Sequence, residues 1–392
     1  MKRHLVFVTN SRADYGKLKP LIQAIDSLEK GTLDHPMSGK ISYAIFVCGM
    51  HLLEKYGSTY IEIFKDGFSH VFLAKQSTPP PPPQQSMDLA LADTIAKFHD
   101  FIDHQRPDLI VFHGDRLETL ACAIVGSFNS ILSAHIEGGE LSGTLDESIR
   151  HSVSKLAHLH FVCEERARQI LLQMGERAEN IFVIGSSDID VMLGDLPSFS
   201  QVQARYSQIQ AFRRQYAILI YHPVVSEIID LPHTIYEILE GCKLATQRGQ
   251  NFVCIYPNND LGSEAILNAL ATLKNNPHFV CFPSMKFEYF LTLLKNAQFI
   301  IGNSSAGIRE AGVYGVPCLN LGSRQHKRSM ASHITQVKED RHAILEAILE
   351  VKAKPRHQPT YHFGTGQSVA HFLNALTPAL FDTPTQKYFA HD

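Results

Sequence analysis

The chain has 392 residues, of which 44% are hydrophobic and 19% charged, so it is long enough for two domains with separate cores. Its formal net charge of -3 at pH 7 argues against a broad nucleic-acid-binding face. No run of about 20 apolar residues is present, so we expect no membrane span. The 7 cysteines are scattered without a C-x-x-C pair, which favours reduced thiols in a cytoplasmic protein.

Short apolar runs typical of strands alternate with longer segments of helical periodicity. The predicted strands are 4–9, 41–47, 109–112, 131–135, 159–163, 181–184, 217–221, 252–256, 279–282, 298–301 and 317–320. The predicted helices are 16–29, 51–63, 87–104, 116–128, 147–157, 164–174, 233–247, 262–274, 286–296, 305–313, 340–350 and 369–376. This alternation predicts βαβ units and therefore parallel sheets with helices on both faces.

These strands are too many for one ordinary doubly wound sheet, and the polar stretch 185–216, predicted to be irregular, separates them into two groups. The predicted fold is α/β, with two Rossmann-like, doubly wound parallel-sheet domains and an active site in the cleft between them. We expect the first domain to comprise residues 1–185 plus the C-terminal segment 368–392, and the second 186–367. The prolines at 79–83 predict a stiff surface loop or, alternatively, a loop at the rim of the cleft.

Two polar clusters follow neighbouring predicted strands in the first half. His113-Gly-Asp-Arg116 comes directly after one apolar run. The segment 135–151 follows the next and carries Glu137, Asp146 and Arg150 around a pair of glycines. Because ligands bind beyond the carboxyl ends of parallel strands, these two segments predict an active site rich in carboxylates.

The segment 9–18 follows the first strand and opens a helix whose N-terminus is suited to anions. Arg12 and Lys17 add positive charge there. The segment matches neither G-x-G-x-x-G nor a Walker loop, so it does not support dinucleotide or ATP binding in those modes. Asp14 is as well suited to capping the helix as to catalysis.

In the second half, the segment 300–310 repeats this pattern of strand, polar loop and helix. Ser304 and Ser305 offer donors for a diphosphate, and Glu310 could accept from a ribose diol. The alternative is plain N-capping by Asn303 or Ser304.

His222 and Asn258 also follow predicted strands of the second half and are expected to face the cleft; the alternative for His222 is a structural role. The 21 histidines raise the question of zinc, but the closest pair, His158 and His160, has no further ligands at metal spacing. We therefore predict no metal and no cofactor.

At these residues the chain resembles the hydrolysing UDP-N-acetylglucosamine 2-epimerases, which include bacterial enzymes of sialic-acid capsule synthesis and the epimerase half of the animal bifunctional epimerase/kinase. The matching segments, in family order, are Arg12-Ala-Asp-Tyr-Gly-Lys17, His113-Gly-Asp-Arg116, His135-Ile-Glu-Gly-Gly-Glu-Leu-Ser-Gly-Thr144, Asp146-x-Ser-Ile-Arg-His151, His222-Pro223, Tyr256-Pro-Asn258, Gly302-Asn-Ser-Ser-Ala-Gly-Ile-Arg-Glu310 and Leu321-Gly-Ser-Arg-Gln325. No kinase segment follows them, so the resemblance is to the single-function bacterial type.

The resemblance implies a GT-B-like fold and conversion of UDP-N-acetylglucosamine and water into N-acetylmannosamine and UDP. It implies catalytic roles for Asp115, Glu137, Asp146, Arg150 and His222. The implied contacts to the UDP-sugar are Arg12, Lys17, Arg116, Asn258, Ser304, Ser305, Glu310 and Arg324, with His222 again among them. It further implies a homodimer or homotetramer that uses no cofactor and no membrane or nucleic-acid partner.

Four alternatives stay open. The sugar could instead be a UDP-2,4-diacetamido-2,4,6-trideoxyglucose of the legionaminic-type pathway. A non-hydrolysing epimerase would return the UDP-sugar intact. A GT-B glycosyltransferase would leave C2 of the sugar unchanged, and a non-catalytic nucleotide-sugar sensor would bind without turnover; the carboxylate-rich first half argues against both.

Overall fold

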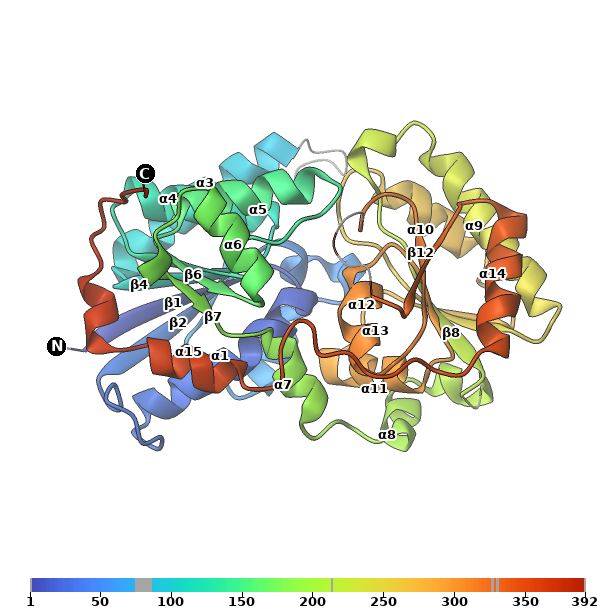
Figure 1. The fold of residues 1–392 in the computed structure, drawn as a ribbon, viewed down its shortest axis with the longest axis horizontal. Coiled ribbons are helices and arrows are strands. Elements are labelled where there is room, and N and C mark those ends of the chain that lie inside the picture. Colours follow the sequence, from blue (N-terminus) through green and yellow to red (C-terminus); the bar gives the residue numbers. More distant parts are fainter. Residues whose placement is uncertain (1, 75–86, 213, 326–327, 329–330, 391–392) are drawn as a thin grey trace. The chain divides into compact units, whose positions relative to one another are not determined.

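The structure, a computed structural model, describes residues 2–74, 87–212, 214–325, 328 and 331–390. Its contacts divide the chain into two compact units (Figure 1). Unit 1 comprises the described residues of Met1–Glu140, Asp146–Leu193 and His362–Asp392, and unit 2 comprises Leu141–Leu145 and Gly194–Tyr361. The prolines at 79–83 lie outside the described residues.

Within the described part of unit 1, the strands form one 7-stranded parallel sheet in the order β3-β2-β1-β4-β5-β6-β7. The strands are β1 (Arg3–Thr9), β2 (Ile41–Val47), β3 (Val71–Leu73), β4 (Leu109–His113), β5 (Ser133–Ile136), β6 (Leu159–Val162) and β7 (Ile181–Val183). The strand order reverses between β1 and β4, so the connections that leave these strands diverge. Such a switch point is where doubly wound sheets bind ligands.

Helices cover both faces of this sheet. They are α1 (Arg12–Glu29), α2 (Tyr60–Lys65), α3 (Met87–Gln105), α4 (Leu117–Phe128), α5 (Leu145–Leu156), α6 (Glu165–Gln173), α7 (Ser187–Leu193) and α15 (Ser368–Ala375). Alternate residues of β1 face opposite sides, as the period of two requires: Phe7 packs into a core that includes α1 and α15, and Val8 into one that includes α3, α4 and α5. Phe372 of α15 packs edge-on against Phe161 of β6, which fixes the C-terminal helix beside α1 (Figure 1).

Unit 2 has the same plan. Its described strands form a 6-stranded parallel sheet in the order β10-β9-β8-β11-β12-β13. They are β8 (Tyr216–Ile220), β9 (Asn251–Ile255), β10 (Phe279–Phe282), β11 (Ile300–Gly302), β12 (Cys318–Leu321) and β13 (Ile334–Val337). The helices are α8 (Phe199–Arg205), α9 (Leu231–Thr246), α10 (Ser263–Ala271), α11 (Phe287–Asn296), α12 (Ser305–Ile308), α13 (Glu310–Val313) and α14 (Arg341–Ala353). Two buried clusters, one on each face, give the unit its own core.

The α/β prediction and every predicted strand are confirmed. The edge strands β3 and β13 were not predicted, because two of the 3 residues of β3 and the middle of β13 are exposed. The helix predicted at 51–63 is wrong in part: Gly57, at φ 90°, separates two short 3-10 turns from α2. The segment 305–313 is two short helices, which meet at Arg309.

The prediction that the segment 185–216 is irregular is wrong, because the segment contains α7 and α8. Both helices are only 7 residues long, and Ser198 begins α8 with a capping box, so local hydrogen bonds rather than a long apolar stripe specify it. No helix of the described chain has both the length and the apolarity needed to cross a membrane.

Candidate active site

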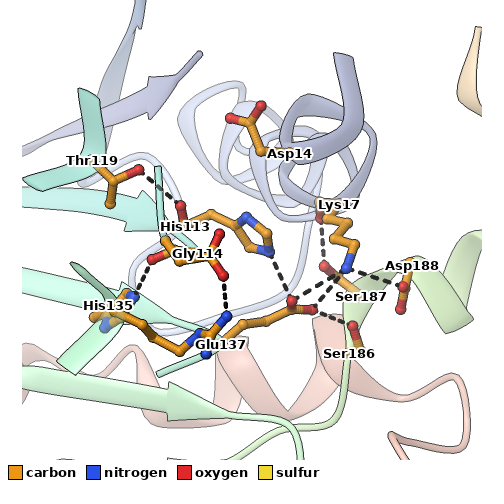
Figure 2. Close-up of polar contacts among 12 residues, drawn as sticks. Asp14, Lys17, His113, Gly114, Thr119, His135, Glu137, Ser186, Ser187 and Asp188 are labelled. Carbon is orange, nitrogen blue, oxygen red and sulfur yellow. Dashed lines mark hydrogen bonds and ion pairs between the residues drawn. The ribbon is translucent and has the colours of Figure 1, made fainter. Parts of the chain in front are cut away.

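The carboxyl ends of four strands of unit 1 bring polar side chains together at one edge of the sheet (Figure 2). Lys17 lies in α1, which follows β1, and His113 ends β4. Glu137 directly follows β5, and Ser186 and Asp188 lie between β7 and the first turn of α7. Because these strands are parallel, residues distant in sequence converge on the switch point between β1 and β4.

Glu137 is the centre of this cluster. Its side chain is buried, and its carboxylate accepts hydrogen bonds from Lys17 Nζ at 3.2 Å and from Ser186 Oγ. His113 Nε2 lies 3.2 Å from Oε2 of Glu137, within ion-pair distance when the ring is protonated. The backbone of Glu137 has φ 63°, a conformation that a residue with a side chain adopts at a cost of roughly 1–3 kcal/mol. Strain of this kind concentrates at functional sites.

Lys17 is held between two carboxylates. Its ammonium is 3.2 Å from Glu137 Oε2 and 3.4 Å from Asp188 Oδ2, and all three side chains are almost fully buried. Ser187 Oγ donates to the backbone carbonyl of Lys17, which ties α1 to the start of α7. The structure therefore directs Lys17 toward Glu137, which the sequence analysis did not foresee.

Asp115 and Arg150 form an ion pair beside this centre. Arg150 is 1% exposed and also donates to the carbonyl of Glu140 at 2.9 Å. Burial alone would lower the pKa of Arg150, but the nearby carboxylates of Asp115, Glu140 and Asp146 outweigh it and raise that pKa. Asp146, half-buried, stands one turn before Arg150 on α5, so both project from the same face of the helix.

His135 supports this arrangement without facing it. Its Nε2–H donates to the Gly114 carbonyl at 2.8 Å, so its Nδ1, 2.9 Å from Ser154 Oγ, accepts. Complete burial lowers the pKa of His135 to about 3, and the ring is neutral at physiological pH. The neutral ring thereby joins the loop that carries Asp115 to α5, the helix that carries Arg150.

The paired glycines of this loop are required by close packing. A Cβ on Gly138 would lie 2.7 Å from Ser154 Oγ, and one on Gly139, at φ 76°, would lie 2.4 Å from the Ala167 carbonyl oxygen. Any side chain would push the loop away from α5 and α6. The pair of glycines noted in the sequence is therefore required for steric reasons.

Three charged residues of the predicted motifs lie at the starts of two helices, α1 and α4. Arg12 is the first residue of α1, and its guanidinium is 4.0 Å from Glu62 Oε1. Arg116 is the N-cap of α4 and is half-buried. Asp14 accepts from the backbone N–H groups of Asn10 and Ser11 and completes a capping box with Ser11. The capping role considered for Asp14 is thus the one that its contacts support.

The predicted nucleotide residues of unit 2 gather around Asn303, which follows β11 and is fully buried. Its side-chain amide donates to the carbonyl of His222 at 2.8 Å and accepts from the N–H of His222 at 2.7 Å. Gly302 allows β11 to approach β8, because a Cβ there would lie 1.8 Å from the Ile220 carbonyl oxygen. Asn303 was considered only as a helix cap, but its amide fixes the loop after β8.

His222 and Asn258 are in direct contact, since the N–H of Asn258 donates to Nδ1 of His222 at 3.0 Å. Ser304 caps α12 by accepting from the N–H of Ala306, which leaves Ser305 as the first residue of that helix. Glu310, the first residue of α13, is buried, and Arg324 Nη1 lies 3.4 Å from the Asn303 carbonyl oxygen. Unit 2 thus gathers its predicted residues at the carboxyl ends of β8, β9, β11 and β12.

One group of side chains has the spacing of cation ligands: Glu137, Glu140 and Cys163 place ligand atoms within 4.8 Å of one another. Glu137 already interacts with Lys17, Ser186 and His113, so its negative charge is offset by protein groups. We assign no metal to this group.

His113, Ser186 and Asp188 belong to the site but had no predicted role. His113 was noted within its motif, and the other two fall in the stretch predicted to be irregular. The available signal was the sequence Gly185-Ser-Ser-Asp188 after a predicted strand, the same pattern that identified the other polar loops.

Two Rossmann-like units, each with polar side chains at the carboxyl edge of a parallel sheet, make the fold GT-B-like, and sheets of this kind bind ligands at that edge. A family model described as UDP-N-acetylglucosamine 2-epimerase matches residues 36–377. The chain belongs to this family, as its motifs predicted.

Curated relatives and a solved structure agree with this assignment. The chain is 40% identical to the UDP-N-acetylglucosamine 2-epimerase of Neisseria meningitidis serogroup B over 99% of both chains. It is 32% identical to the hydrolysing UDP-N,N'-diacetylbacillosamine 2-epimerase of Legionella pneumophila over 94% of both. The crystal structure of Methanocaldococcus jannaschii UDP-GlcNAc 2-epimerase with UDP-GlcNAc and UDP shares the fold, with TM-score 0.73 and 21% identity over 96% of this chain and 99% of that one.

Proposed function

We propose that this protein is a hydrolysing UDP-N-acetylglucosamine 2-epimerase, which converts UDP-N-acetylglucosamine and water into N-acetylmannosamine and UDP for sialic-acid synthesis. The observation that carries the proposal is the buried Glu137 carboxylate, held against Lys17 and His113 at the switch point of the sheet. The Neisseria relative, similar over its whole length, supports the choice of substrate.

The chemistry requires such a site. The hydrogen on C2 of a 2-acetamido sugar is poorly acidic, because no ketone stabilises the carbanion. Coupling its removal to anti elimination of UDP from C1 avoids a free carbanion and gives a glycal. Water then adds across the double bond, with the proton delivered to the opposite face of C2.

These steps need a base, an acid and a cationic environment for the leaving diphosphate. Glu137 and Asp146 are our candidates for the proton transfers, together with Asp115, which Arg150 orients. Each such transfer contributes roughly 10²–10⁴-fold to the rate. We assign UDP binding to Arg12, Arg116 and the residues of unit 2: His222, Asn258, Ser304, Ser305, Glu310 and Arg324.

The first test is proton NMR of UDP-N-acetylglucosamine incubated with the protein in heavy water. We expect free N-acetylmannosamine with deuterium at C2, together with UDP. A UDP-sugar epimerised but still intact would identify a non-hydrolysing epimerase. No exchange and no product would contradict the proposed substrate.

The Legionella relative supports one other substrate, a UDP-2,4-diacetamido-2,4,6-trideoxy sugar, because that relative is named for a UDP-sugar of this kind. The same NMR experiment on the diacetamido sugar decides between the two. If kcat/KM for the diacetamido sugar were tenfold or more above that for UDP-N-acetylglucosamine, the diacetamido sugar would be the substrate instead.

The catalytic assignments are tested by Glu137→Gln and Asp146→Asn, each assayed separately. We expect each to lower kcat by about 10²-fold or more, because each removes a proton-transfer group without changing its size. Glu147→Gln, next to Asp146 on α5, is the control and should stay near wild type. Near-normal turnover in both variants would rule out the assignments.

We further propose that the enzyme acts in the cytoplasm as a homodimer or homotetramer. The cysteines of the described chain form no disulfide bond, which supports a reducing compartment. Light scattering of the purified protein checks the oligomeric state.

A further inference from the structure

The start of α7 contacts the central ion pair through three consecutive residues. Ser186 Oγ donates to the Glu137 carboxylate, and Ser187 Oγ donates to the Lys17 carbonyl. Asp188 Oδ2 lies 3.4 Å from Lys17 Nζ. Ser186, directly before α7, and the first turn of that helix therefore contact both members of the pair, in a stretch that was predicted to be irregular (Figure 2).

Asp188 has no evident task except toward Lys17. It is 1% exposed, and within the described residues its Oδ1 has no hydrogen-bond partner. Burying a carboxylate with half of its hydrogen-bonding capacity unused is costly, so its negative charge needs a reason. Its one ion pair among the described residues is with the ammonium that also holds Glu137.

A single cation between two buried carboxylates cannot neutralise both. If Lys17 paired with Glu137 alone, it would favour the ionised carboxylate and make it a weak base. A second carboxylate near the same ammonium reduces this effect, because like charges disfavour ionisation of each other. General-base catalysis is most efficient when the basicity of the carboxylate approaches the working pH.

We propose that Asp188 is a positioning residue that holds Lys17 between itself and Glu137 and so keeps Glu137 basic enough to accept the proton from C2 of the sugar. This inference rests on the proposed function for the role of Glu137. Lys17 then serves the proton transfer and not the nucleotide.

Other groups also face Glu137 and contribute to its titration. They are His113 at the end of β4, Glu140 in the same loop and Cys163 after β6, together with Lys17 on α1 and Asp188 on α7. The test must therefore change one of these charges at a time and observe Glu137 itself.

The direct measurement is the titration of Glu137 by NMR in protein labelled with [¹³C]carboxyl glutamate, with the Glu137 signal assigned by its loss in Glu137→Gln. We expect Asp188→Asn to lower the Glu137 midpoint by about one pH unit and Lys17→Met to raise it by at least as much. Ser186→Ala should also raise it, because it removes a donor to the charged form. Asp190→Asn, on the same helix but bonded to the N–H groups that open α15, is the matched control and should leave it unchanged.

An unchanged or raised midpoint in Asp188→Asn would overturn the inference. If that variant does not fold, Asp188→Ser deletes the same charge with a smaller side chain. Because the titration needs no substrate, it holds even if the sugar is not N-acetylglucosamine. The acid limb of kcat/KM should move in the same direction as the midpoint. A shifted midpoint with an unmoved limb would support the coupling through Asp188 but contradict Glu137 as the base.

Discussion

His135 shows how a residue outside the reaction can hold the site together. Its neutral ring donates to Gly114 and accepts from Ser154, and its complete burial makes the charged form of the ring costly. Burial lowers the pKa of His135 from 6.5 to about 3 in the folded protein. The folded state therefore binds fewer protons than the unfolded state between these values, and the stability that the neutral ring provides is complete above pH 6.5 and is lost as the pH falls toward 3.

We expect this to appear as an acid-sensitive free energy of unfolding. Between pH 6.5 and pH 4.5 the wild type should lose about 1 kcal/mol per pH unit more than His135→Gln, which cannot take up the proton. Urea unfolding at these two pH values measures the difference. Parallel pH dependences in the two proteins would mean that His135 is not the group responsible. His51, also buried with a pKa lowered to about 4, is present in both proteins and cancels.

Single residues also show the limit of reading a sequence alone. The carboxylates, with the glycine pair among them, were predictable as site residues, because polar residues directly after an apolar run indicate the carboxyl end of a strand. The contact of Lys17 with Glu137 was not, since the two are 120 positions apart and Lys17 is equally well suited to a phosphate. Asp188 was missed because its short helix has no apolar periodicity to reveal it.

Among the elements, the predicted strands were all found, because buried parallel strands are nearly continuous apolar runs. The edge strands were not predicted, since their sequences have mixed polarity. The short helices were not predicted, since they depend on capping hydrogen bonds. The C-terminal helix was predicted from its own pattern. The segment after it was expected to belong with the first domain, but the contacts that Lys387 makes were not predicted, because they are polar bonds to distant carbonyls.

The C-terminal segment after α15 binds the C-terminal end of α5 through Lys387. Lys387 Nζ donates to the carbonyls of Ser154 and Lys155 at 2.9 and 3.0 Å and to that of Ala157, and pairs with the buried Glu176 at 2.7 Å. Cations stabilise the negative end of a helix in this position. Burial lowers the pKa of Lys387 to about 8, so it is still mainly charged at pH 7.

We expect Lys387→Met to lower the free energy of unfolding at pH 7 by about 2 kcal/mol, because it removes a charged donor from buried carbonyls and from Glu176. Lys354→Met is the control, since that lysine forms an exposed pair with Glu350 worth little. Urea unfolding followed by circular dichroism compares the three proteins. Equal stability of both variants would show that the segment does not fasten α5.

For the whole molecule, the two units have separate sheets, separate cores and different chemistry at their carboxyl edges. Unit 1 gathers buried carboxylates with one lysine and one arginine between them. Unit 2 gathers amides, hydroxyls and Arg324 around Asn303. Acidic groups suit proton transfer and repel a diphosphate, whereas neutral donors and a guanidinium suit the diphosphate itself.

This division predicts how UDP binding responds to substitution in each unit. Arg324→Met should weaken UDP binding by about tenfold or more, because a charge-assisted hydrogen bond contributes roughly 1.5–3 kcal/mol. Asp146→Asn should bind UDP no more weakly than wild type, because it removes only a negative charge. Isothermal titration with UDP measures both, and Arg248→Met, an exposed arginine of unit 2, controls for the loss of charge. If Asp146→Asn weakened UDP binding as much as Arg324→Met, the acids of unit 1 would belong to nucleotide binding, and their assignment to proton transfer would be wrong.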